Sequence, residues 1–146
     1  MRRSLAPLLV VSLGISASGC TPDDPEASVR AFIAAAEGAA EARETGFFRA
    51  AISPSYADRR GQRRDDVINV IRGVFVTNAT VEVVSRIETI ELAGADAAMV
   101  KLQAAFVGKG EGASLLDVDG DLYRIELELV RESGDWRVIG ADWERL

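Results

Sequence analysis

The residue types that could carry chemistry in this chain are few. The chain contains no histidine and a single cysteine, Cys20. Zinc sites of the cysteine–histidine type, serine–histidine triads and cysteine–histidine dyads are therefore excluded, and so is a disulfide within the chain. Any acid–base work falls to the carboxylates, tyrosines, lysines and arginines.

Tyr56 and Asp58 form the candidate acid–base pair. They lie in the polar stretch SPSYADRRGQRRDD, residues 53–66, which its proline and glycine mark as a loop. In one interpretation Tyr56 is a hydrogen-bond donor and Asp58 a base, whose pKa an apolar pocket would raise into a useful range. In the other, Asp58 pairs with Arg59 or Arg60, or accepts backbone amides of its own turn. Tyr56 then fills the core.

The two tryptophans are the remaining candidates for a ligand pocket. Trp136 and Trp143 could offer an aromatic wall to a molecule that Tyr56 and Asp58 also contact. The alternative is that both rings are core residues at one end of a sheet. Both interpretations stay open.

Four arginines follow Asp58: Arg59, Arg60, Arg63 and Arg64. These four side chains could bind an anionic lipid headgroup or the acidic side chains of a partner protein. The alternative is a solvated loop in which they bond to the nearby Asp65 and Asp66.

The segment DVDGDLYRIELE, residues 117–128, superficially resembles a calcium-binding loop. Its Gly120 comes one step before the third acid instead of one step after it. The second half also alternates like a strand, which an ion-binding loop cannot do. We therefore expect a hairpin turn at Asp119-Gly120, and we expect neither a metal nor a cofactor.

Cys20 ends a stretch with three parts, MRRSLAPLLVVSLGISASGC. A positive start is followed by an uncharged apolar run from Leu5 to Ile15 and then by small residues, which is the layout of an export signal. The run is too short to span a membrane as a helix, which needs about 20 apolar residues.

The last four residues of that stretch, Ala17-Ser18-Gly19-Cys20, resemble a bacterial lipobox, although leucine is commoner in the place of Ala17. The resemblance implies that a diacylglyceryl group is transferred to the Cys20 thiol and that the chain is cut before it. The alternative is an ordinary signal peptide cut after Ala17 or Gly19, which leaves a free thiol. An aspartate after the cysteine resembles an inner-membrane retention signal, so Thr21 favours the outer membrane.

Removal of residues 1–19 leaves 127 residues, the length of one small domain. Two arginines leave with that segment, which changes the formal net charge from −6 to −8. An acidic domain is a poor partner for nucleic acid or for anionic lipid headgroups.

Three helices are expected in the first half of the mature chain. The first starts at the Asp-Asp-Pro-Glu signal of residues 23–26 and runs to about Thr45. A short second helix covers 47–52, and Asp65 or a neighbour caps the third. The predicted buried stripe of the third helix consists of Val67, Ile68, Ile71, Val74 and Phe75.

After Asn78 the pattern changes to that of strands. Four are predicted, at 79–92, 97–107, 122–131 and 136–143, joined by the turns AGAD, GKGEGAS and ESGD. A change of phase between Val84 and Ile87 predicts a bulge or a strong bend. Helices that precede an antiparallel meander indicate an α+β fold, with a bent sheet wrapped around the helices.

This layout is similar to the nuclear transport factor 2-like superfamily. The similarity is carried by the helix 25–45, by SPSYADRRG before the next helix, and by the closing GDWRVIGADWERL, in which an aromatic residue follows a Gly-Asp turn. It covers residues 25–146 and is a match of architecture more than of motif. It implies a cystatin-like α+β cone, in which N-terminal helices pack in a curved four-stranded antiparallel sheet.

The superfamily includes enzymes that use a pocket aspartate with a histidine or tyrosine, and also many binding modules without catalysis. The dehydratase pattern fails here because the chain has no histidine. The resemblance is also compatible with a homodimer formed through the open face of the sheet.

We therefore expect a signal peptide at 1–19, a lipidated tether at 20–24 and one folded domain at 25–146. The expected function is that of a membrane-anchored periplasmic lipoprotein that binds a protein partner or a small apolar ligand, and no nucleic acid. The alternative is a small lyase or isomerase of the ketosteroid isomerase-like type, with Asp58 as base and Tyr56 as donor.

Overall fold

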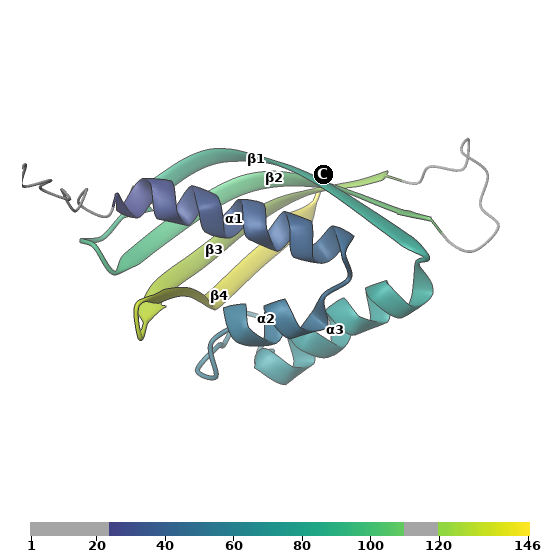
Figure 1. Ribbon diagram of the computed structural model, residues 1–146, viewed down its shortest axis with the longest axis horizontal. Coiled ribbons are helices and arrows are strands. Elements are labelled where there is room, and N and C mark those ends of the chain that lie inside the picture. The colour runs from purple at the N-terminus through teal and green to yellow at the C-terminus, as the bar shows by residue number, and fades with distance from the viewer. Residues whose placement is uncertain (1–23, 110–119) are drawn as a thin grey trace, which may run out of the picture.

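The computed structural model describes residues 24–109 and 120–146 (Figure 1). Three helices come first: α1 (Pro25–Glu41), α2 (Thr45–Ala51) and α3 (Arg64–Thr77). Four strands follow: β1 (Thr80–Leu92), β2 (Ala97–Lys109), β3 (Gly120–Glu132) and β4 (Asp135–Arg145). Within these two described ranges, no helix combines the length and the hydropathy that crossing a bilayer requires.

The strands form one antiparallel sheet in the order β1-β2-β3-β4, so each strand pairs with the next along the chain. The sheet is curved, and the helices lie on its concave side (Figure 1). The register shifts between Ile87 and Thr89 in β1, and again between Glu128 and Leu129 where β3 pairs with β4. Such bulges bend a strand. The predicted α+β architecture is confirmed, and the bulge of the first strand directly follows the predicted change of phase.

Helix α1 starts where the sequence predicts. The Asp24 side chain accepts the N–H groups of Glu26 and Ala27 at 3.0 and 3.3 Å. These are two of the amides that a helix leaves without an internal partner at its start. Pro25 occupies the first turn, where its missing N–H costs nothing.

The end of α1 lies at Glu41, earlier than the predicted end near Thr45. Arg43 adopts a left-handed φ of 55°, and the Arg43 N–H donates to the Ala40 carbonyl at 3.0 Å, which closes the helix. The Arg43 guanidinium in turn donates to the Asn78 carbonyl at 3.2 Å, just past the end of α3. A contact between distant segments thus accompanies the end of the helix, and the left-handed residue there is Arg43 instead of Gly46, the glycine at which the sequence predicts the stop.

The core lies between the concave face of the sheet and the inner faces of α1 and α3. Val29 of α1, Ile68 of α3 and Val100 of β2 have no exposed surface. The inner face of α3 is narrower than predicted, because only Ile68 and Phe75 are fully buried on it. Val74, predicted in the buried stripe, is 42% exposed, so that part of the prediction is wrong.

Two arginines fasten the end of α2 to its neighbours. Arg64, the first residue of α3, donates to the Arg49 carbonyl, and Arg137 of β4 donates to the Ala50 carbonyl at 2.8 Å. The last carbonyls of a helix have no partner inside it, so these side chains satisfy them. The chain that leaves α2 is thereby held next to β4.

Candidate functional site

The loop between α2 and α3 runs along the free edge of β4. The Ser53 N–H donates to the Val138 carbonyl at 2.9 Å, and the Ala57 N–H donates to the Ile139 carbonyl at 3.1 Å. β4 is the last strand of the sheet, so one of its edges is open to such pairing. The loop therefore holds both acid–base candidates beside β4.

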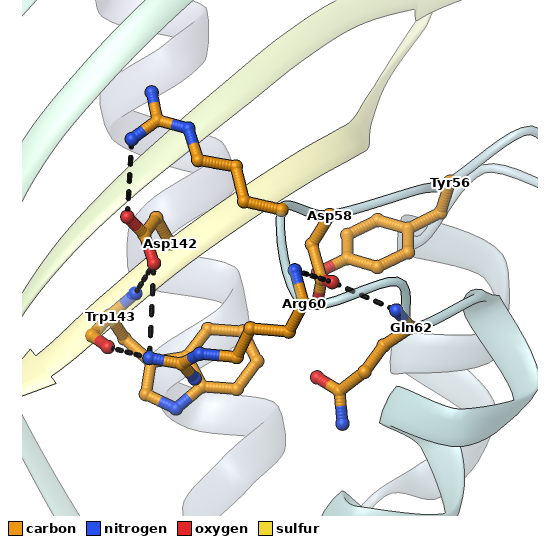
Figure 2. A network of polar contacts seen from close by, with 7 residues as sticks. Tyr56, Asp58, Arg60, Gln62, Asp142 and Trp143 are labelled. Carbon is orange, nitrogen blue, oxygen red and sulfur yellow. Dashed lines mark hydrogen bonds and ion pairs between the residues drawn. The ribbon is translucent and has the colours of Figure 1, made fainter.

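Tyr56 and Asp58 contact each other in this loop, as Figure 2 shows. The Tyr56 hydroxyl donates to Asp58 Oδ2 at 3.1 Å. Tyr56 is 1% exposed and belongs to the main core cluster. Burial raises the pKa of the Tyr56 phenol above its ordinary value, and the negative charge of Asp58 raises it further. The phenol therefore acts as a donor to Asp58 at physiological pH.

The Asp58 carboxylate is occupied by its own turn. Oδ1 accepts the N–H groups of Arg60 and Gln62, both at 2.9 Å, while Oδ2 accepts the Tyr56 hydroxyl. Gly61 supplies the left-handed φ of 77° at which the turn closes. Three donors fix the orientation of this carboxylate, which is the arrangement of a turn-forming aspartate.

The cavity beside Asp58 is small, with a volume of about 40 Å³. Its walls are the loop residues Ala57, Asp58 and Arg59 and the strand residues Met99, Glu126, Glu128, Gly140, Ala141 and Asp142. Met99 and Glu128 alternate with the buried Val100 and Leu129, so they point to the convex, outer face of the sheet. The depression therefore opens on the outer face, and it is far below the roughly 300–1,000 Å³ of a typical ligand pocket.

Trp143 is covered by Arg60 (Figure 2). The guanidinium carbon of Arg60 lies 4.3 Å from the centre of the indole ring, and Nη2 donates to the Trp143 carbonyl. The Asp142 carboxylate lies 3.3 Å from Arg59 and 3.8 Å from Arg60. Trp143 therefore lies close to the Asp58 turn, with an arginine stacked on its ring.

Trp136 lies apart from the other three pocket candidates. It comes seven residues before Trp143 in β4, which corresponds to about 23 Å along a strand. Its Nε1 donates to Ser28 Oγ at 2.8 Å, its ring lies 4.7 Å from the guanidinium carbon of Arg131, and it is 7% exposed. The structure thus brings Tyr56, Asp58 and Trp143 together, whereas Trp136 fastens the start of α1 to the sheet.

The loop arginines take partners in several elements. Arg59 and Arg60 pair with Asp142, which lies 83 residues after Arg59 in the chain. The Arg63 N–H donates to Asp66 Oδ2 at 2.8 Å at the start of α3. Sequence reasoning considered only nearby acids as partners and missed Asp142, because no local pattern links it to the loop.

The remaining candidates are not part of this cluster. Cys20, Asp117 and Asp119 lie outside the residues that the structure describes. In the part of the chain that is described, no three acidic side chains converge as ligands of a metal ion. Glu126, beside the depression, lies 3.8 Å from the Lys101 ammonium.

No family model and no curated protein sequence matches the chain. Solved structures do share its fold. A provisionally assigned scytalone dehydratase from Novosphingobium aromaticivorans has a TM-score of 0.73 at 9% identity, over 83% of each chain. A provisionally assigned dehydratase of the nuclear transport factor 2-like family from Streptomyces avermitilis has 0.72 at 14% identity, over 86% of this chain and 99% of that one.

A ketosteroid isomerase-like protein from Erwinia carotovora atroseptica has a TM-score of 0.64 at 16% identity, over 82% of this chain and 95% of the other. At such identities the likeness shows the fold alone. Three helices packed against an open four-stranded antiparallel sheet match the nuclear transport factor 2-like cone of these neighbours.

Proposed function

We propose that this protein is a lipid-anchored lipoprotein of the bacterial envelope that acts as a binding or interaction module, for a protein partner or a small apolar ligand. The anchor is the Cys20 thiol, on the strength of the ASGC sequence and of the export signal before it. Two or more acyl chains on one residue hold a protein firmly to a membrane without spanning it. Thr21, in place of aspartate, favours the periplasmic face of the outer membrane.

One observation carries the binding role: a row of apolar side chains crosses the outer face of the sheet. The outer apolar row consists of Val84, Ala105, Leu122 and Leu146, which the register places next to one another. Val84, Leu122 and Leu146 are 72%, 41% and 51% exposed. Single exposed apolar residues are ordinary, whereas a contiguous set of them indicates an interaction site.

A second copy of the chain is one partner that fits the row. The adjacent row across the same face contains Arg86, Gln103, Arg124 and Glu144. If two sheets pack face to face about a two-fold axis parallel to the strands, Arg86 faces Glu144 of the partner subunit. An interface between identical copies requires this kind of self-complementarity.

Leu122→Arg tests the row, and Leu92→Arg is its matched control. The two leucines are 41% and 42% exposed, but Leu92 ends β1 and lies outside the row. We expect Leu122→Arg to abolish self-association in sedimentation equilibrium, or the binding of an apolar fluorescent dye if the occupant is a small ligand. Leu92→Arg should behave like the wild type. Equal behaviour of both variants in both assays would remove the row as the binding surface.

The second candidate is a small lyase or isomerase with Asp58 as base and Tyr56 as donor. It is favoured by the 3.1 Å contact of the pair and by neighbours whose names include dehydratases and a ketosteroid isomerase-like protein. The three hydrogen bonds that the Asp58 carboxylate already accepts and the small cavity beside it speak for the binding module instead. Proton exchange into carbonyl substrates, followed by NMR in heavy water, tests it: a rate that Asp58→Asn abolishes in a folded variant would establish the enzyme.

A further inference from the structure

The start of α1 and two turns of the sheet lie together at one end of the molecule (Figure 1). Ser28 Oγ, in the first turn of α1, accepts hydrogen bonds from Arg131 at 2.9 Å and from Trp136 at 2.8 Å. Arg131 lies in β3 and Trp136 in β4, the two strands of one hairpin. The Arg131 N–H donates to the Asp96 carbonyl at 2.8 Å, which adds the β1–β2 turn to the group. We call this the tether end, because the chain that follows Cys20 enters the domain here.

The outer apolar row lies well away from the tether end. Ser85, the neighbour of Val84, donates its N–H to Glu37 of α1 at 2.8 Å. Glu37 comes twelve residues after Pro25 in α1, which corresponds to about 18 Å along a helix. The row therefore stands nearly the length of α1 from the point where the chain enters.

Exposed apolar side chains are unevenly distributed between the two ends. On the described residues the large exposed ones are Val70, Val74, Val76, Val84, Leu92, Leu122 and Leu146. Of these, Leu92 alone borders the turns of the tether end. Val74 and Val76 lie near the end of α3, beside the Arg43–Asn78 contact that joins it to the end of α1.

Charge disfavours a domain that lies flat on an anionic bilayer. The outer face of the sheet carries the acids Glu126, Glu128, Asp142 and Glu144 on β3 and β4. Its basic side chains Arg86, Lys101 and Arg124 are each paired with an acid, namely Glu88, Glu126 and Glu144. The tether end is acidic too, with exposed Asp24, Glu26, Glu91, Asp96 and Asp135, so the short chain from Cys20, and not charge, is what keeps this end near the headgroups. Anionic headgroups attract basic surfaces, and they repel acidic ones over about a Debye length.

We propose that the anchored protein stands on its tether end and holds the outer apolar row away from the bilayer, so that the partner of the row reaches it from the aqueous phase. This inference rests on the proposed lipid anchor at Cys20. From Cys20 to Pro25 the chain advances five residues and spans at most about 17 Å. The tether end must therefore stay near the headgroups, whereas the row need not.

A matched pair of labelling sites tests the orientation. Ala95, in the β1–β2 turn, and Ala79, between α3 and β1, are both exposed alanines, one at each end. The substitutions Ala95→Cys and Ala79→Cys are each made in the full chain, and both variants are purified from membranes. Each variant is labelled with a thiol-reactive donor dye and reconstituted in phosphatidylcholine–phosphatidylglycerol vesicles that contain acceptor lipids. Flotation of the vesicles reports anchoring, and energy transfer reports the distance of each site from the bilayer.

We expect both variants to float and the dye at residue 95 to transfer energy several-fold more efficiently than the dye at residue 79. Flotation with equal transfer, or with stronger transfer from residue 79, would overturn the orientation and leave the anchor standing. Protein that does not float would instead overturn the anchor, and with it the premise of the orientation. A Cys20→Ser form of each variant is the control for flotation without lipid.

Discussion

The Tyr56 hydroxyl and the Asp58 carboxylate are joined by a 3.1 Å hydrogen bond, and the same carboxylate holds two backbone amides at 2.9 Å. The pair has the residue types of an acid–base dyad and the geometry of a closed turn. A base needs a free lone pair within reach of a substrate proton, and the cavity here holds only about 40 Å³. These contacts close the turn within the α2–α3 loop, which the backbone bonds of Ser53 and Ala57 hold beside β4.

Tyr56→Phe removes the hydroxyl and keeps the ring in the core. The variant should lose about 1–2 kcal/mol of unfolding free energy, because Asp58 loses one donor while its amide bonds remain. Urea denaturation measures the loss. Tyr123→Phe, in β3 and only partly buried, is the control and should lose less. Equal losses would mean that the Tyr56–Asp58 hydrogen bond contributes nothing of its own.

The same tyrosine makes stability fall at alkaline pH. The folded-state pKa of Tyr56 is raised above the unfolded value of about 10. Its contribution is therefore fully present below pH ~10 and is lost as pH rises above that value, where only the unfolded state readily releases the proton. Unfolding free energies at increasing pH should fall more steeply in the wild type than in Tyr56→Phe. Parallel curves would contradict the raised pKa.

Ser28→Ala should loosen the tether end. The Ser28 hydroxyl is the acceptor for both Trp136 Nε1 and Arg131, and Trp136 is 7% exposed. A donor left without a partner at a buried site costs about 1–3 kcal/mol. We expect this loss in urea denaturation, together with a change in tryptophan fluorescence. Thr80→Ala, at an exposed site, should show neither, and a Ser28→Ala variant as stable as that control would refute the role of the hydroxyl.

The β3–β4 turn can be improved by one substitution. Ser133 and Gly134 have φ values of 54° and 90°, which is the pattern of a type I′ turn. Asparagine tolerates the first of these angles better than serine does. Ser133→Asn should therefore raise the unfolding free energy by up to about 1 kcal/mol, whereas Gly134→Ala should lower it by about 1 kcal/mol or more. Thermal unfolding of both variants shows whether each substitution stabilises or destabilises the fold, and a stabilised Gly134→Ala variant would contradict this turn type.

Local patterns predicted most of the fold. The Val, Ile and Thr content of 79–92 and the alternation along 122–131 predicted strands, and the turns between strands predicted their order. The Asp24-Pro25 signal predicted the start of α1. What they missed depends on contacts between distant segments. The end of α1 is accompanied by the contact from Arg43 to Asn78, and α3 exposes Val74 because only a narrow face of that helix is buried.

The candidate site shows the same division. The turn-forming interpretation of Asp58 was available from the sequence, because an aspartate in a loop commonly accepts the backbone N–H of the residue two positions later, here Arg60. The partner of Arg59 and Arg60 was not, since Asp142 approaches them only when β4 closes the sheet. The structural role of Trp136 was equally hidden, because its hydrogen-bond acceptor, Ser28, lies 108 residues away in the chain. Trp136 was therefore counted among the pocket candidates.

Lipidation of Cys20 is the claim on which the membrane anchor, the proposed location and the proposed orientation all depend. Mass spectrometry of the N-terminal peptide of protein extracted from native membranes tests it most directly. The predicted result is a mature chain that begins at Cys20 and carries a diacylglyceryl thioether. An unmodified Cys20 thiol, or a mature chain that begins at another residue, would contradict it.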